Sequence, residues 1–132
     1  MERTLVFVKP DGVKRGLVGK ILARFEEKGI KLVALRQLEM DAELCDKHYI
    51  EHVEQPFYPN LKAYILSGPI VAMVLEAEKV VSMVRLMVGA TDAAEAAPGT
   101  LRGDFAISKS ENIVHASDSV ASANREIANF FE

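Results

Sequence analysis

Runs of consecutive apolar residues alternate along this chain with segments in which apolar residues recur every three or four positions. Short continuous runs are typical of buried strands, whereas the periodic segments are typical of amphipathic helices. The predicted strands are residues 5–8, 30–38, 70–75 and 112–115. The clearest helical spacing is that of Val13, Leu17, Ile21 and Phe25, and Gly29 is expected to end that helix.

Other helices are predicted from the same spacing and from residues that favour helix ends. Asp41 can cap a helix that passes Leu44 and ends at about Ile50. The remaining helices are expected from residue 60 or 61 to 66, over 80–88 with Gly89 at the end, and over 120–131. Residues 54–60 hold two prolines and are predicted to be loop. Residues 89–110 form a second, unusually long loop, and loops of this length tend to be functional.

This order of elements predicts a particular fold class. Two βαβ-like halves that share one sheet indicate an α+β protein with the ferredoxin-like βαββαβ arrangement. We expect a four-stranded antiparallel sheet with helices packed on one of its faces. The sequence contains neither an internal repeat nor a linker, so residues 1–132 are predicted to form one domain.

Composition narrows the class of protein. Hydrophobic residues make up 49% and charged residues 27%, which is typical of a soluble globular chain and not of a disordered one. A net charge of −3 argues against bulk attraction to nucleic acid or anionic membrane, although a local basic pocket stays compatible with it. With one cysteine, no signal-peptide pattern and no apolar run of about 20 residues, we expect a cytoplasmic protein without an internal disulfide.

The stretch from Asn112 to Ser119 holds the most reactive candidate, His115, between a short strand and the start of a helix. A neutral imidazole has a nucleophilic nitrogen that can meet a phosphoryl group. A hydrolase triad of His115 with Ser117 and Asp118 is disfavoured, because adjacent residues rarely point at one another as a triad requires. His48 and His52 have the i, i+4 spacing of metal ligands but lack an obvious third ligand, so a structural role is favoured for His48.

Neither a P-loop nor a G-x-G-x-x-G motif is present, so any bound phosphate must be held mostly by side chains. Guanidinium and ammonium groups suit that task. The candidates are Lys9, Arg85, Arg102, Thr91 and Asn112. Phe57 lies between two prolines on a loop, where its ring can contact a partner or stack on a base.

Residues 112–119, Asn-Ile-Val-His-Ala-Ser-Asp-Ser, resemble the active-site signature N-x-x-H-[GA]-S-D-S of the nucleoside diphosphate kinases. The resemblance covers nearly the whole chain, because further segments match the family in order and spacing. These segments are residues 4–12, 48–49, 56–58, 67–74, 89–92 and 98–105. The fold implied by the family is the same ferredoxin-like core.

The resemblance implies a ping-pong reaction in which His115 takes the γ-phosphoryl group of a nucleoside triphosphate, usually ATP, on Nδ1. The group then passes to a nucleoside diphosphate. Glu126 is expected to accept a hydrogen bond from the other ring nitrogen, with Ser117 in the same network. The family pattern places Lys9 and Tyr49 near the γ-phosphoryl group.

Nucleotide-binding roles follow from the same resemblance. Arg85, Thr91 and Arg102 are expected to hold the distal phosphates, with His52 close by. The resemblance implies that Phe57 stacks on the base and that Asn112 and Lys9 bond the ribose hydroxyls. Mg²⁺ is expected to be held mainly by phosphates and water, with no protein ligand assigned. The family also implies a homo-oligomer, for which we favour a hexamer over a tetramer.

Four departures from the family pattern concern affinity and loop rigidity. They are Ala116, Gln55, Ala93 and Lys109.

Two other functions compete with the interpretation of the sequence as a kinase. A non-catalytic ferredoxin-like module that binds nucleotides or nucleic acid would need a basic, aromatic sheet face, and these strands are too apolar for one. An inactive regulatory relative would have lost His115, Lys9 or an arginine, and the sequence retains them all.

Overall fold

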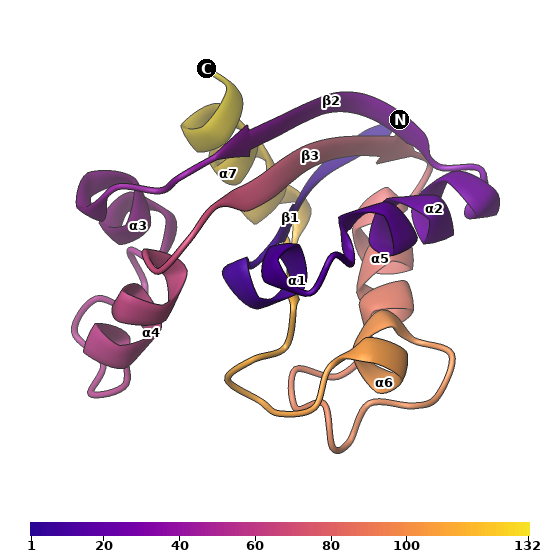
Figure 1. Ribbon diagram of the computed structural model, residues 1–132. Helices are drawn as coiled ribbons and strands as arrows, with labels where there is room; N and C mark the ends of the chain where they lie inside the picture. Colours follow the sequence, from indigo (N-terminus) through magenta and orange to yellow (C-terminus); the bar gives the residue numbers. More distant parts are fainter.

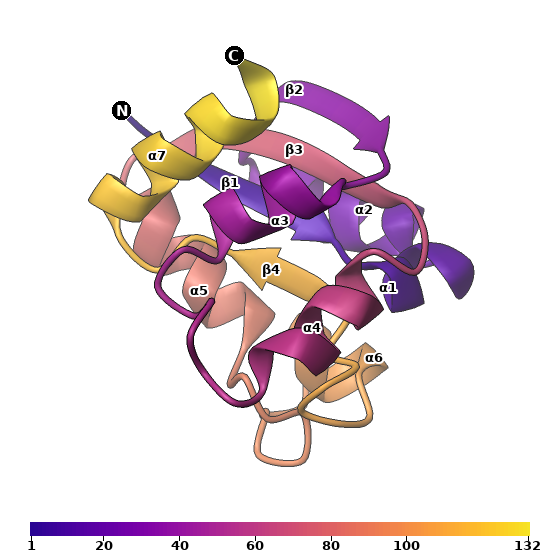
Figure 2. The same ribbon diagram turned by 90° about the vertical axis from the view of Figure 1, so that its left-hand side faces the viewer.

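The core of the fold is a four-stranded antiparallel sheet. The computed structural model describes residues 1–132. Its strands are β1 (Glu2–Val8), β2 (Lys31–Leu38), β3 (Ile70–Ala77) and β4 (Val114–Ala116), in the spatial order β2-β3-β1-β4. Every neighbouring pair is antiparallel, and β1, β2 and β3 are labelled in Figure 1 and β4 in Figure 2. The predicted ferredoxin-like α+β sheet is therefore confirmed.

Seven helices connect and cover these strands. They are α1 (Pro10–Lys14), α2 (Val18–Lys28), α3 (Ala42–His48), α4 (Tyr58–Ile65), α5 (Val80–Val88), α6 (Leu101–Phe105) and α7 (Val120–Phe131). The predicted caps are present, since the Asp41 carboxylate accepts a hydrogen bond from the Leu44 N–H and Gly89 follows the last residue of α5.

The sheet is covered on both faces, which contradicts the expectation of helices on one face only. Along β1, Val6 and Val8 belong to one hydrophobic core with residues of α2 and α5. Leu5 and Phe7 point the other way, into a second core that includes residues of α3, α4 and α7. Figure 2 shows α3 and α7 in front of the sheet and α2 behind it. Because β1 and β3 are apolar on both faces, each face needs a cover.

Two helix boundaries differ from the prediction for local reasons. The expected helix from Val13 to Phe25 is divided into α1 and α2, because Gly16 adopts a φ of 71° that no helix continues through. Helix α4 begins at Tyr58, within the segment predicted to be loop. Pro59 sits in its first turn, where a missing N–H costs no helical hydrogen bond.

The segment 89–110 was predicted to be a loop without structure, and this is wrong at α6. Thr100 caps α6 by accepting a hydrogen bond from the Gly103 N–H, and Leu101 is buried in the first core. The helix thereby holds Arg102 in a buried position.

The central pairing of β1 with β4 positions the chemistry. Phe7 lies opposite His115 in this register, so Lys9, which follows β1, comes close to the histidine. None of the helices is long and apolar enough to span a membrane.

Candidate active site

A pocket of about 930 Å³ gathers most of the predicted site residues. Those that line it are Lys9, Tyr49, His52, Phe57, Arg85, Thr91, Arg102, Asn112, His115 and Glu126. Ser117 is fully buried and does not line the pocket, but its hydroxyl donates to Glu126, which does. Segments from all parts of the chain thus meet at one cavity, which sequence spacing alone could not demonstrate.

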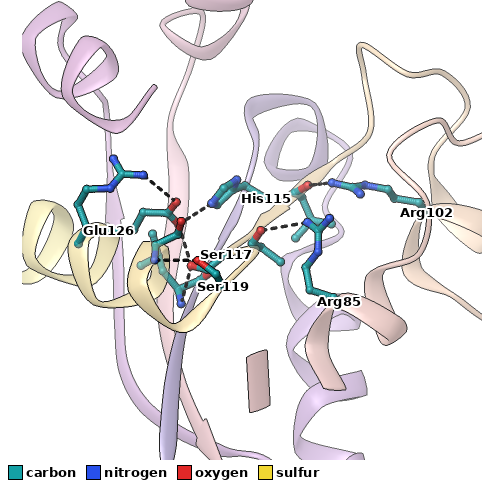
Figure 3. A network of polar contacts seen from close by, with 11 residues as sticks. Arg85, Arg102, His115, Ser117, Ser119 and Glu126 are labelled. Carbon is teal, nitrogen blue, oxygen red and sulfur yellow. Dashed lines mark hydrogen bonds and ion pairs between the residues drawn. The ribbon is translucent and has the colours of Figure 1, made fainter. Parts of the chain in front are cut away.

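The His115 ring is fixed on one side by a carboxylate. Its Nε2 lies 2.8 Å from Glu126 Oε1, and the Ser117 hydroxyl donates to the same oxygen over 2.7 Å (Figure 3). The ring also stacks on Phe7, with centroids 4.8 Å apart. An Nε2 that bonds to a carboxylate carries the proton, so Nδ1 retains its lone pair.

The surroundings favour a neutral imidazole. Burial lowers the pKa of His115 well below its ordinary value, and the positive charges of Lys9, Arg102 and Arg85 lower it further. Burial raises the pKa of Glu126, while the hydrogen bond from Ser117 acts in the opposite direction. His115 is therefore an uncharged nucleophile at neutral pH.

Two successive hydrogen bonds hold the Lys9 side chain in place. Its Nζ donates to Asn112 Oδ1 over 2.7 Å, and Asn112 Nδ2 donates to the Thr91 carbonyl over 3.0 Å. Burial, followed by repulsion from Arg102, lowers the pKa of Lys9 to about 8. The ammonium group is thus mostly charged at neutral pH and ready to meet an anion.

Arg102 braces the backbone around the pocket. Its guanidinium donates to the carbonyls of Gly89 at 3.1 Å, Asn112 at 3.4 Å and Val114 at 2.7 Å. Arg85 is exposed and donates to the Ala116 carbonyl over 3.2 Å. In Figure 3 both arginines lie on the side of His115 opposite Glu126. The cations and the carboxylate therefore flank the histidine from two sides.

A strained turn precedes the histidine where the sequence predicted the start of a strand. Ile113 has a φ of 63°, and the Val114 N–H donates to the Asn112 carbonyl over 2.8 Å. This is the bonding of a γ-turn, and positive φ is costly for a β-branched residue. Strand β4 therefore begins only at Val114.

His48 is the clearest residue in the pocket that sequence reasoning set aside. The centroid of its ring lies 4.6 Å from that of the His115 ring, and the two ring planes make an angle of 84°. His48 Nδ1 is buried without a hydrogen-bond partner. Burial, followed by repulsion from His115, lowers the pKa of His48 to about 2. The i, i+4 spacing with His52 does not indicate the role of His48, because the relevant neighbour, His115, is 67 positions away in the sequence. The match of residues 48–49 to the family was the only signal for it.

The outer rim of the pocket is open. Phe57 is 51% exposed, and its ring lies 5.6 Å from that of His52, which is exposed as well. Lys109 lines the same pocket. An exposed aromatic ring can stack on any planar partner, since stacking reads no hydrogen-bond pattern.

These features define a class of site. A neutral imidazole nitrogen faces a pocket whose lining includes Lys9, Arg85 and Arg102, which suits transfer of a phosphoryl group from a polyphosphate to histidine. Arginine forks match phosphate oxygens, and no covalent machinery beyond the nucleophile is required.

Comparison with known proteins gives the family. Residues 2–132 match the family model described as nucleoside diphosphate kinase. The nucleoside diphosphate kinase of Archaeoglobus fulgidus is 56% identical over 131 residues, covering 99% of this chain and 87% of the relative. That of Thermus thermophilus is also 56% identical and is covered to 96%. The Halobacterium salinarum enzyme, solved in complex with CDP, shows a TM-score of 0.97 and 48% identity over 99% of this chain and 88% of its own.

The chain belongs to the nucleoside diphosphate kinase family. It is an enzyme that transfers the terminal phosphoryl group of a nucleoside triphosphate to a nucleoside diphosphate. The family interpretation of the sequence is thereby confirmed.

Proposed function

We propose that His115 carries the phosphoryl group between the two nucleotides. In the first half-reaction Nδ1 attacks the γ-phosphorus of the donor, the bond to the β–γ bridging oxygen breaks, and the diphosphate leaves. In the second half-reaction an acceptor diphosphate oxygen attacks the phosphohistidine and restores the free imidazole. The observation that carries this proposal is the 2.8 Å contact of Nε2 with Glu126, which leaves Nδ1 as the free nitrogen.

Glu126 and Ser117 are proposed to fix the ring and its tautomer. As Nδ1 gains phosphorus, positive charge develops on the ring, and the Glu126 carboxylate stabilises it. Lys9 and Tyr49 are proposed to neutralise and orient the transferred group. The buried Tyr49 hydroxyl has no hydrogen-bond partner within the chain, so it is available as a donor to a phosphate oxygen.

The remaining residues of the pocket are proposed to bind the nucleotide. Arg85, Thr91 and Arg102 hold the distal phosphates with His52 nearby, and Phe57 stacks on the base. Asn112, together with Lys9, bonds the ribose hydroxyls. The CDP bound to the H. salinarum relative supports a diphosphate as the occupant. We propose ATP as the usual donor.

Mg²⁺ is proposed to enter with the nucleotide, on its phosphate oxygens. The candidate donor atoms nearest one another, those of His48, His115 and Glu126, lie within 4.8 Å. Two of the three are imidazole nitrogens, whereas Mg²⁺ prefers oxygen, and the Glu126 oxygen already accepts two hydrogen bonds. When bound, the ion supplies further neutralisation of phosphate charge. The chain's own part is to meet the remaining charge with Lys9, Arg85 and Arg102.

We further propose that residues 1–132 act as one domain within a homo-oligomer, a hexamer in preference to a tetramer. The exposed backbone of the edge strand β2 supports self-association. The cytoplasm is the proposed compartment, where the free thiol of Cys45 stays reduced.

Incubation with γ-labelled ATP tests the role of His115. We expect an acid-labile, base-stable label that any nucleoside diphosphate removes and that is absent from His115→Ala. The exposed His52 provides the matched control, since His52→Ala should still take up the label. An acid-stable label, or a labelled His115→Ala variant, would contradict the proposal.

A further inference from the structure

The strained turn before His115 is supported by Asp11, which in turn contacts Tyr64, and the catalytic scheme uses neither residue. The Ile113 N–H donates to Asp11 Oδ2 over 3.1 Å. The other oxygen of the same carboxylate, Oδ1, accepts a hydrogen bond from the Tyr64 hydroxyl. Asp11 thus connects α4 to the catalytic turn, across 53 positions of sequence on one side and 102 on the other.

The turn needs external support because its conformation is unfavourable. A β-branched residue at positive φ relaxes unless surrounding contacts over-determine it. Three contacts come from the segment after β1: the Asp11 carboxylate on the Ile113 N–H, the Lys9 N–H on the Ile113 carbonyl at 2.8 Å, and close approach of Gly12. A Cβ at Gly12 would lie 2.6 Å from Val8 Cγ1 and 3.0 Å from that carbonyl, so a larger residue here would have to displace the Val8 side chain or the turn itself.

The positions of the catalytic side chains depend on the conformation of this turn. Asn112, on its N-terminal side, holds the Lys9 ammonium. The carbonyls of Asn112 and Val114, on either side of Ile113, accept from Arg102. His115 follows two residues after Ile113. A rotation of the Ile113 peptide would therefore displace the nucleophile, the lysine and the arginine together.

Tyr64 connects this support to the wall of the nucleotide pocket. Its ring lines the pocket, and it belongs to α4, the helix that starts directly after Phe57. Burial and the hydrogen bond to Asp11 raise the pKa of the Tyr64 hydroxyl, so the hydroxyl remains protonated and a donor. Its proton fixes one carboxylate oxygen, which leaves the other directed at the Ile113 N–H.

We propose that Asp11 and Tyr64 are positioning residues for phosphoryl transfer, which hold the turn at Ile113 and thereby align His115 Nδ1 and the Lys9 ammonium with the γ-phosphorus. The inference rests on the proposed role of His115. It assigns Tyr64 a function in catalysis through Asp11, without contact to the reacting atoms.

Tyr58 offers a matched control on the same helix. Its hydroxyl also donates to a carboxylate, that of Asp46, over 2.7 Å, and it contacts Cys45 at 3.4 Å. Neither partner touches the turn or the nucleotide pocket. Tyr64→Phe and Tyr58→Phe therefore each remove one tyrosine–carboxylate hydrogen bond from α4, and only the first removes support from Ile113.

The experiment measures the single-turnover rate at which the full-length enzyme takes up the phosphoryl group from saturating ATP, the affinity for ADP, and the melting temperature. We expect Tyr64→Phe to be slower than wild type by about fivefold to tenfold, with ADP affinity changed by less than about twofold. Tyr58→Phe should stay within about twofold of the wild-type rate, although it also melts at a lower temperature.

Asp11→Asn keeps the side-chain size but offers only one accepting oxygen, so it cannot serve both donors. If the two residues act as one unit, the double variant Asp11→Asn/Tyr64→Phe should be no slower than the slower single variant. Equal rates for Tyr64→Phe and Tyr58→Phe would overturn the proposal, as would additive effects in the double variant. A change confined to ADP affinity would do so too, because it would make Tyr64 only part of the pocket wall.

Failure of this inference is distinguishable from failure of the proposed function. If His115 is not the carrier, the wild-type enzyme lacks the histidine-bound label. If only the inference is wrong, the label forms normally and the two tyrosine variants behave alike.

Discussion

The two sides of the pocket differ in how tightly their side chains are held. The inner wall, which we define as Lys9, Arg102, Asn112, His115 and Glu126, consists of buried or largely buried groups, each with a hydrogen bond of 2.7 to 2.8 Å. The outer rim, Phe57, His52, Thr91 and Arg85, is exposed, and Phe57 retains 51% of its surface. The side chains of the inner wall are held in fixed positions, whereas those of the rim are exposed and can contact a ligand with their surfaces.

This difference matches the two tasks of the enzyme. Phosphoryl transfer requires in-line geometry and fixed charges, which a buried and hydrogen-bonded wall provides. An enzyme that exchanges phosphoryl groups between different nucleosides gains nothing from reading one base. An exposed ring that stacks without hydrogen-bond readout suits that purpose. Substitutions in the inner wall should therefore slow the transfer step, whereas those in the rim should affect binding alone.

The largest effect is expected from Glu126→Gln. The amide can turn its NH₂ toward Nε2, which would favour the wrong tautomer of His115 and remove the charge that stabilises the phosphorylated ring. We expect the rate of phosphoenzyme formation to fall about 100-fold with nucleotide affinity nearly unchanged. Rapid-quench kinetics beside equilibrium ADP binding measures both. A variant that binds ADP poorly but transfers at the wild-type rate would contradict the division between wall and rim.

The second effect concerns Lys9 and pH. Because the pKa of Lys9 is lowered to about 8, kcat/KM should fall as the pH rises through about 8, where the free enzyme loses this charge. The free energy of unfolding should instead increase as the pH rises. An unfolded lysine has a pKa of about 10.4, so between about pH 8 and 10 the unfolded chain binds more protons and folding gains up to about 2 kcal/mol as the pH rises.

The comparison is between wild type and Lys9→Met. Denaturant unfolding at several pH values should show the rise in stability only for the wild type. The same slope in both proteins would place the titration on another group.

Arg102→Lys should have an intermediate effect. Lysine keeps the positive charge but cannot reach the Gly89, Asn112 and Val114 carbonyls together. We expect about a tenfold loss of nucleotide affinity, a slower transfer step and a lower melting temperature. Arg85→Lys, with one backbone contact to lose, should melt close to wild type. Similar melting temperatures for both variants would argue against the bracing role of Arg102.

The smallest effect is expected from Phe57→Ala in the rim. Loss of one stacked ring should weaken nucleotide binding by about 1 kcal/mol, or about fivefold in KM, with little change in the single-turnover rate at saturation. Purine and pyrimidine nucleotides should be affected in proportion to their stacking strength. A large loss in the rate at saturation would show that the rim takes part in aligning the phosphates.

The sheet and most helices could be predicted because their patterns are local. The apolar run at 70–75 and the apolar residue at every fourth position over 80–88 directly indicate which residues are buried. The family motif at 112–119 locates the histidine. The covering of both sheet faces was already implicit in strands that are apolar throughout, although the prediction chose one face.

What the sequence could not predict depends on contacts between distant segments. The turn at Ile113 is held by Asp11 and Lys9, more than 100 positions away, and no local propensity favours a positive φ at isoleucine. His48 lies beside His115 because α3 covers the sheet face on which the His115 ring stacks on Phe7. The short helix α6 contradicted the long loop expected there, since a single buried leucine and a threonine cap define it.

The most direct test of the fixed inner wall is to identify which nitrogen of His115 bears phosphorus. Because Nε2 is bound to Glu126, the phosphoryl group should be on Nδ1. Phosphorus and ¹⁵N-histidine NMR of the phosphorylated enzyme, unfolded under alkaline conditions that preserve phosphohistidine, identifies the site. We predict the Nδ1-phosphorylated isomer on His115 alone. The Nε2-phosphorylated isomer would contradict the fixed inner wall on which the account rests.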